Sequence, residues 1–244
     1  MFYLTWIGLA SARILFWTFC VLALTLQARG GTVEVLSGAR FSGDYGLKVT
    51  LEGFSLAFVE DGSPEAETHY RARFFINTGD VQLSDEDAFD VFAGYDGLGS
   101  VQFRLEILKA GGTLFIRGLA RLDEGGFEAS EPIAVAAGYH LIEMEWMAGD
   151  PAGAMRLWVN EAEPLELSLP GNGSARIEWV RLGSVNGIDP TAAGSLAIDD
   201  FVSNQGDPIG PLGCNSIFQY QSALAAWEMD VTVLIQLLNE ACFL

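Results

Sequence analysis

The sequence is poor in positive charge. It contains 13 Lys and Arg residues against 32 Asp and Glu residues, a formal net charge of −19, and its only lysines are Lys48 and Lys109. A chain this acidic repels nucleic acid and anionic lipid headgroups, so we expect neither as a partner. The charge suits cation binding, a neutral or basic ligand, or an acidic surface that keeps the protein soluble.

Side chains that form most zinc and nucleophilic sites are also scarce. The two histidines, His69 and His140, are isolated, and the chain has no HExxH motif and no Cys/His ligand spacing. These absences argue against a zinc site. The sequence has no GxSxG elbow and no phosphate-binding glycine-rich loop. Its 28 glycines stand mainly in turns.

The N-terminal segment differs in composition from the rest of the chain. Residues 14–26 form an uninterrupted apolar run that follows Arg13. The run is too short to span a bilayer comfortably, and residues 26–28 offer a cleavage site. We therefore expect residues 1–28 to be a signal peptide and the protein to be secreted, periplasmic or at the cell surface. An uncleaved membrane anchor is the alternative, and only then is the membrane a partner.

The central part of the chain consists of short alternating apolar runs separated by turn sequences rich in Gly, Asp, Asn and Pro. No long amphipathic helix lies between the runs. We therefore predict an all-β domain over residues 33–210, an antiparallel two-sheet β-sandwich of the jelly-roll kind. The candidate strands are residues 46–52, 68–76, 88–93, 101–109, 113–122, 140–147, 154–159, 165–169, 176–183 and 195–203.

The C-terminal segment, residues 214–244, has no Gly or Pro and carries apolar residues at helical spacing. We predict a helical C-terminal extension that docks on the sandwich or mediates self-association, since its apolar face needs a partner. A poorly folded extension is the alternative. A continuous helix would hold Cys214 and Cys242 about 40 Å apart. The helix and a disulfide between these cysteines, which an oxidising compartment would permit, therefore exclude each other.

Strand alternation places several arginines and one tryptophan on polar strand faces: Arg71, Arg73, Arg104 and Trp158. One interpretation is a groove in which these guanidinium groups and this ring bind sugar hydroxyls or carboxylates. The other is cross-strand pairing of Arg with Glu on a solvated sheet face, which needs no ligand. The sequence leaves both interpretations open.

Four loose motifs occur in a characteristic order along the chain. They are SGDYGLKV at 42–49, THYRARF at 68–74, LIEMEW at 141–146 followed by RLWVN at 156–160, and IDDFV at 198–202. In this order they resemble bacterial secreted domains of the laminin-G-like, concanavalin A-like jelly-roll class, over residues 33–210. The resemblance implies a binding or structural module, often with a structural calcium ion, although some relatives are glycoside hydrolases or lyases.

The same resemblance implies residues for a calcium site. Similar sandwiches use an acidic residue of the closing strand together with early-strand backbone, which points to Asp200 as a ligand, with Asp44 as a possible second one. Calcium requires several oxygen ligands of this kind. Because neighbouring strand residues face opposite ways, we expect at most one of Asp199 and Asp200 to point toward a shared site. The alternative is that both are surface acids.

A carboxylate pair raises the question of catalysis. Glu143 and Glu145 share one strand face, about 6.6 Å apart by strand rise, and glycoside hydrolysis requires two carboxylates. Concanavalin A-like glucanases have the pattern Glu-x-Asp-x-x-Glu, but here Ala148 takes the place of the third acid. The sequence therefore predicts no enzyme but a carbohydrate-binding or surface-interaction module, with a glycan or another surface protein as partner. A polysaccharide-degrading enzyme using Glu143 and Glu145 and a purely structural envelope domain are the alternatives.

Overall fold

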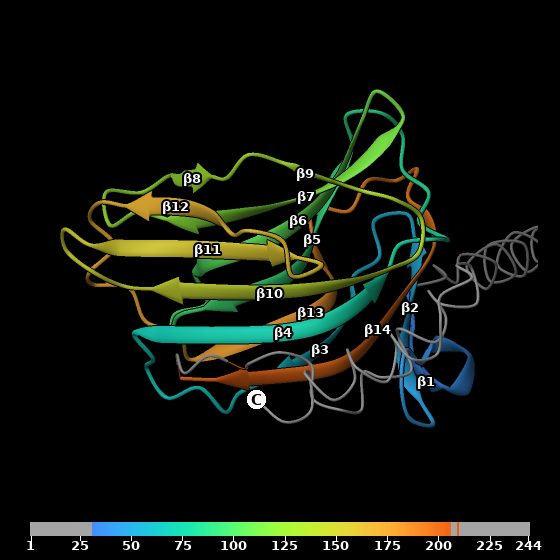
Figure 1. Cartoon of the computed structure of the whole chain (residues 1–244), viewed down its shortest axis with the longest axis horizontal. Helices are drawn as coiled ribbons and strands as arrows, with labels where there is room; N and C mark the ends of the chain where they lie inside the picture. The colour runs from blue at the N-terminus through green and yellow to red at the C-terminus, as the bar shows by residue number, and fades with distance from the viewer. Residues whose placement is uncertain (1–30, 206–208, 210–244) are drawn as a thin grey trace, which may run out of the picture. The chain divides into compact units, whose positions relative to one another are not determined.

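The computed structural model describes residues 31–205 and residue 209. These residues form two seven-stranded antiparallel sheets that pack face to face (Figure 1). The predicted all-β two-sheet sandwich is therefore confirmed. The predicted signal peptide (1–28), the helical extension (214–244) and both of its cysteines lie outside the described residues. Within the described part of the chain, no helix has the length and hydropathy needed to cross a membrane.

The two sheets have a simple strand order. Sheet A contains, from edge to edge, β1 (Val33–Leu36), β2 (Gly46–Glu52), β14 (Ala193–Asn204), β4 (His69–Asn77), β10 (Tyr139–Met147), β11 (Gly153–Val159) and β12 (Leu165–Leu169). Sheet B contains β3 (Ala57–Asp61), β13 (Trp179–Asn186), β5 (Ala88–Tyr95), β6 (Val101–Ala110), β7 (Thr113–Arg121) and β8 (Phe127–Ala129), and β9 (Ile133–Val135) also pairs with β7. The short 3-10 helix η1 (Ser37–Ala39) follows β1.

All ten predicted strands are present, with ends shifted by three residues or fewer. Four further strands, β1, β3, β8 and β9, were not predicted. They have only three to five residues each, and most of their residues are exposed or half-buried. A run this short shows too few alternations to stand out from a loop.

Aromatic side chains from both sheets fill the space between them. Phe74 and Trp146 of sheet A and Phe92 and Phe103 of sheet B have no exposed surface. The ring centroid of Phe103 lies 5.6 Å from that of Phe92 and 6.1 Å from that of Trp146. Burial of each such side chain contributes about 1.5–3 kcal/mol. Gly94 permits this packing, since a Cβ there would lie 2.4 Å from the Phe103 ring.

Candidate functional site

Oppositely charged side chains alternate across the outer face of sheet A. Strand register sets Glu145 of β10 between Arg71 of β4 and Arg156 of β11, and sets Arg156 opposite Glu166 of β12. Glu145 lies 2.9 Å from Nη2 of Arg71 and 2.9 Å from Nη1 of Arg156. Arg156 Nη2 lies 3.1 Å from Glu166. The cross-strand Arg–Glu pairing considered from the sequence is therefore present.

His69 and Glu143 extend this arrangement. His69, at the start of β4, places Nε2 2.8 Å from Oε1 of Glu145, which is only 4% exposed. Arg71 Nη1 lies 3.4 Å from Glu143, so a single guanidinium group contacts both carboxylates. We refer to His69, Arg71, Arg73, Glu143, Glu145, Arg156 and Trp158 as the outer-face cluster.

The surroundings of the two glutamates shift their pKa values in opposite directions. Burial raises the pKa of Glu143, and the nearby charges of Arg71 and Arg73 offset this only in part. Burial acts in the same direction on Glu145, but hydrogen bonds from His69 and Arg156 and the charge of Arg71 outweigh it, so its pKa is lowered. Two neighbouring carboxyl groups with separated pKa values are suited to opposite proton-transfer roles.

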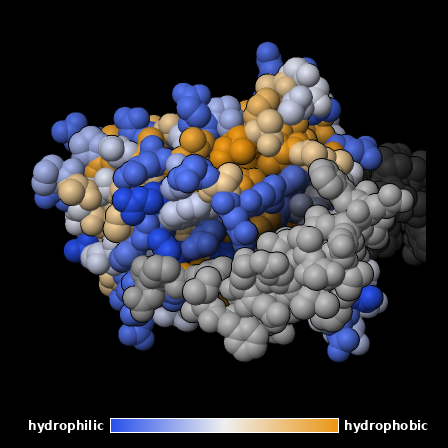
Figure 2. All heavy atoms as spheres, in the orientation of Figure 1, coloured by the Kyte–Doolittle hydropathy of each residue, from blue (hydrophilic) through white to orange (hydrophobic). Residues whose placement is uncertain are grey.

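Three of the four residues predicted to bind a ligand meet in the cluster. Trp158 of β11 and Arg73 of β4 both lie opposite Glu143, and both are half-buried. The guanidinium carbon of Arg71 lies 5.2 Å from the centroid of the Trp158 ring. Hydrophilic residues gather over β10 and β11 on this face (Figure 2). Cations, carboxylates and one aromatic ring are thus available together.

Arg104 does not belong to this group. It lies on β6 of sheet B, where Nη1 is 3.3 Å from the buried carboxylate of Asp90. Its guanidinium carbon lies 4.9 Å from the centroid of the Phe127 ring. The predicted grouping was wrong for this residue, because alternation assigns a face to each strand but does not tell which sheet contains the strand.

Asp199 and Asp200 both contact the loop that follows η1. Asp199 Oδ2 accepts hydrogen bonds from the backbone N–H groups of Phe41, at 2.7 Å, and Ser42, at 3.0 Å. Asp200 Oδ2 accepts a hydrogen bond of 2.7 Å from the Ser42 hydroxyl. Both aspartates thus reach one loop, although regular strand alternation would turn only one of them that way. The register of β14 against β4 shifts between Asp199 and Val202, and Asp200 has a φ of 51°, so alternation is interrupted there.

These contacts bear on the predicted calcium site. Asp44 lies in the same loop, two residues from Ser42, so the structure brings the two predicted ligands to one region. However, Asp199 and Asp200 already accept hydrogen bonds from the loop, and no three His, Cys, Asp or Glu side chains among the described residues are grouped to hold a metal ion. The side chains present do not by themselves form a metal site, and calcium binding stays a prediction.

His69 is the functional candidate that sequence reasoning missed. It was treated as isolated because no other histidine or cysteine stands near it in the sequence. Its position two residues before Arg71 places both on one face of a strand, and this signal was available. What the sequence did not contain was the pairing of β4 with β10, which brings His69 to Glu145.

No family model matches the chain, and no curated protein matches its sequence. Among solved structures, the globular domain of T. cruzi calreticulin has a TM-score of 0.51 and 9% identity, covering 88% of this chain and 90% of that one. An exolytic PL7 alginate lyase from Zobellia galactanivorans has a TM-score of 0.50 and 8% identity, covering 77% and 92%. At this identity the likeness concerns the fold, a jelly-roll β-sandwich of the concanavalin A-like type. It does not single out laminin-G-like domains.

The comparison with the alginate lyase corrects one prediction. The sequence predicts a non-catalytic module, partly because the glucanase motif lacks its third acid. This alginate lyase has the same fold, so the fold does not favour a module without activity. A lyase also does not need the glucanase motif, and the missing acid at Ala148 therefore loses its weight as an argument against catalysis.

Proposed function

We propose that the protein is an exported polysaccharide lyase that cleaves an acidic polysaccharide on the outer face of sheet A. The observation that carries the proposal is the His69–Glu145 pair, which stands beside Arg71 and Arg73 in a fold that alginate lyases share. The whole chain is acidic, but this face gathers three arginines and a histidine. These arginines balance the charges of Glu143, Glu145 and Glu166, so a polyanion meets a nearly neutral face rather than a strongly acidic surface.

Cleavage by a lyase is a β-elimination at a uronic acid residue. A cation first neutralises the sugar carboxylate, which makes the proton on the adjacent carbon more acidic. A base takes this proton, the released electron pair forms a carbon–carbon double bond, and the glycosidic carbon–oxygen bond breaks. The leaving oxygen takes a proton from an acid, so no water is consumed.

The outer-face cluster contains a group for each of these roles. Arg73 binds the carboxylate, since a guanidinium group matches its planar geometry. Arg71, whose Nη1 and Nη2 contact Glu143 and Glu145, holds the two glutamates in place. In this mechanism Nε2 of His69 donates its proton in a hydrogen bond to Glu145, and Nδ1 acts as the base. Glu145 is thus a positioning residue. Glu143, whose pKa is raised, supplies the proton to the leaving oxygen, and Trp158 offers a ring face on which a sugar stacks.

Hydrolysis is the second candidate reaction. The separated pKa values of Glu143 and Glu145 favour it, since a glycosidase also uses one protonated and one ionised carboxyl group. The two reactions differ in their products. A lyase leaves an unsaturated sugar at the new non-reducing end, whereas a hydrolase adds water and leaves none.

The test uses the full chain with alginate and, in parallel, a neutral β-glucan. Ultraviolet absorbance of the new double bond and the number of reducing ends are measured together. We expect both signals from alginate, and a loss of at least about 100-fold in His69→Gln, which is typical for removal of a general base. New reducing ends without the absorbance would indicate hydrolysis. No cleavage of either polysaccharide would overturn the proposal of an enzyme.

A further inference from the structure

A pocket of about 460 Å³ opens between the two sheets, away from the outer-face cluster. It lies where β1 and β3 form neighbouring edges of sheets A and B, and β2, β13 and β14 complete its walls. No residue of the outer-face cluster lines it. Its volume is within the range of about 300–1,000 Å³ that is usual for small-molecule sites.

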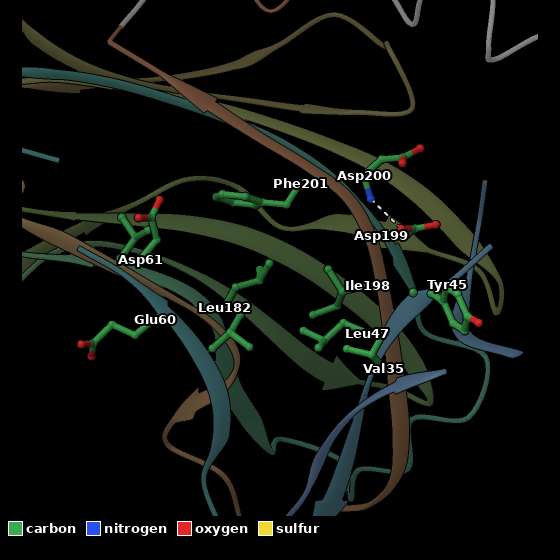
Figure 3. Close-up of a pocket in the computed structure, with 13 residues that line it drawn as sticks. Val35, Tyr45, Leu47, Glu60, Asp61, Leu182, Ile198, Asp199, Asp200 and Phe201 are labelled. Carbon is green, nitrogen blue, oxygen red and sulfur yellow. Dashed lines mark hydrogen bonds between the residues drawn. The ribbon is translucent and has the colours of Figure 1, made fainter. Parts of the chain in front are cut away.

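The interior of this pocket is apolar. Leu47, Leu182 and Ile198 point toward one another from three different strands (Figure 3). Phe201 also lines the pocket, and its ring packs against the core ring of Phe92 with 5.9 Å between centroids. Val59, on β3, also lines the pocket and is 40% exposed. An apolar group that entered here would leave water for a preformed hydrophobic surface.

The rim of the pocket is acidic. Glu60, Asp61, Asp199 and Asp200 all contribute to the lining, whereas the described lining residues include no Lys or Arg. The carboxylates of Glu60 and Asp200 point away from the apolar side chains, toward the outside of the pocket (Figure 3). Arg181 pairs with Glu60 at 2.9 Å and offsets one of the four charges. The remaining negative charge disfavours the binding of an anionic ligand such as a fatty acid and favours the binding of a cation.

We propose that this pocket binds a small amphipathic cation, whose apolar part enters between the sheets and whose ammonium or guanidinium group stays at the acidic rim. The apolar interior provides the affinity, and the rim charges select the sign of the ligand. The site is separate from the proposed lyase site, so either can exist without the other.

Three probes with the same alkyl chain, namely octylamine, octanol and octanoate, test the proposal by calorimetric titration of the full chain. We expect octylamine to bind about fivefold more tightly than octanol, the limit for an exposed pair of opposite charges, and octanoate to bind most weakly. High salt should remove the difference between amine and alcohol. Equal binding of all three probes, or no binding of octylamine, would overturn the proposal.

Two variants and a control locate the site. Val59→Trp fills the mouth and should abolish octylamine binding, whereas Leu98→Trp, at a position that is 93% exposed and does not line the pocket, should leave it unchanged. Asp200→Asn removes one rim charge and should weaken the binding of octylamine. Octanol binding should stay unchanged, because Asn also adopts the positive φ of this position and so keeps the backbone in place. Octylamine binding that survives Val59→Trp contradicts the proposal. The proposal is also contradicted if the wild-type protein is a dimer and Val59→Trp converts it to a monomer. A second copy of the chain, and not a small cation, would then occupy the pocket.

Discussion

His69 Nε2 lies 2.8 Å from Oε1 of Glu145, although 76 positions separate the two residues in the sequence. The strand register does not set them directly opposite, because Met147 faces His69 and Arg71 faces Glu145. The imidazole instead reaches diagonally along the face of the sheet. The carboxylate of Glu145 therefore contacts His69, Arg71 and Arg156 together. The arrangement of the outer-face cluster depends on this carboxylate.

The first prediction concerns the loss of this central carboxylate. Glu145→Gln keeps the size of the side chain but removes the closer of the two carboxylates, at 2.9 Å, from the buried guanidinium of Arg71. We expect the free energy of unfolding to fall by about 2 kcal/mol, as measured by urea denaturation at neutral pH. Because the pKa of Glu145 is lowered in the folded state, its stabilisation is present above about pH 4.5 and is lost as the pH falls through the folded-state pKa. The difference in unfolding free energy between variant and wild type should therefore become smaller at acidic pH.

Glu166→Gln is the matched control. Among the described residues Glu166 forms an ion pair with Arg156 alone, and its side chain is 55% exposed, so water screens the pair. The expected loss is at most about 0.5 kcal/mol. An equal loss in the two variants would show that the face is a uniform set of surface ion pairs rather than an arrangement centred on Glu145.

The second prediction is that loss of the Glu143 carboxylate stabilises the protein, the opposite of the effect expected for Glu145. Burial raises the folded-state pKa of Glu143, so the folded protein loses stability as the pH rises through the range between 4.5 and that raised pKa. Glu143→Gln removes this loss and should make the protein more stable at neutral pH, with no gain well below pH 4.5. Urea denaturation at several pH values measures both effects. A variant that is less stable at neutral pH would contradict the assignment of Glu143 as the carboxyl group that holds its proton.

Alternating sequence patterns predicted most of this fold. The strand at 101–109, for example, carries Phe103 and Leu105, which the structure buries completely, on the face assigned to the core. The pattern failed where backbone geometry departs from a regular strand. The bulge in β14 turns both Asp199 and Asp200 toward one loop, and neither residue type signals such a bulge.

The site was harder to predict than the fold, since it depends on which strands are neighbours. Arg71, Arg73 and Glu145 were identified as polar-face residues, but their pairing required the β4–β10 register. Arg104 carries the same local signal and lies on the other sheet. Strand order in a sandwich follows from long-range packing of the whole core, and a local pattern carries no information on it.

The third prediction tests the attachment of the loop to β14. Asp199→Asn removes the charge from an oxygen that accepts two backbone N–H hydrogen bonds, and we expect a loss of about 1 kcal/mol in unfolding free energy. Faster hydrogen exchange at the amides of Phe41 and Ser42 should accompany it. Asp200→Asn, which keeps an acceptor for the Ser42 hydroxyl, serves as the control and should change stability by less than about 0.5 kcal/mol. Exchange rates that stay unchanged in Asp199→Asn would count against this role.

The fourth prediction concerns calcium. If Asp200 and Asp44 bind the ion that the family resemblance implies, calcium at 100 times its dissociation constant should stabilise the protein by about 2.7 kcal/mol. Melting curves recorded with calcium and with a chelator measure the shift, which Asp200→Asn should remove. The same midpoint under both conditions would end the calcium hypothesis and leave the two aspartates with a purely structural role.

The last prediction separates the two sheets in their effect on activity. Arg73→Lys loses the planar pair of donors for a sugar carboxylate, and we expect kcat/KM on alginate to fall at least about tenfold, mainly through a higher KM. Arg104→Lys keeps a positive charge beside Asp90 on the opposite sheet and should leave cleavage unchanged. Melting temperatures of both variants control for folding. If Arg104→Lys lost as much activity as Arg73→Lys at equal stability, the reaction would not be confined to the outer face of sheet A, because Arg104 contacts Asp90 and Phe127 on the other sheet.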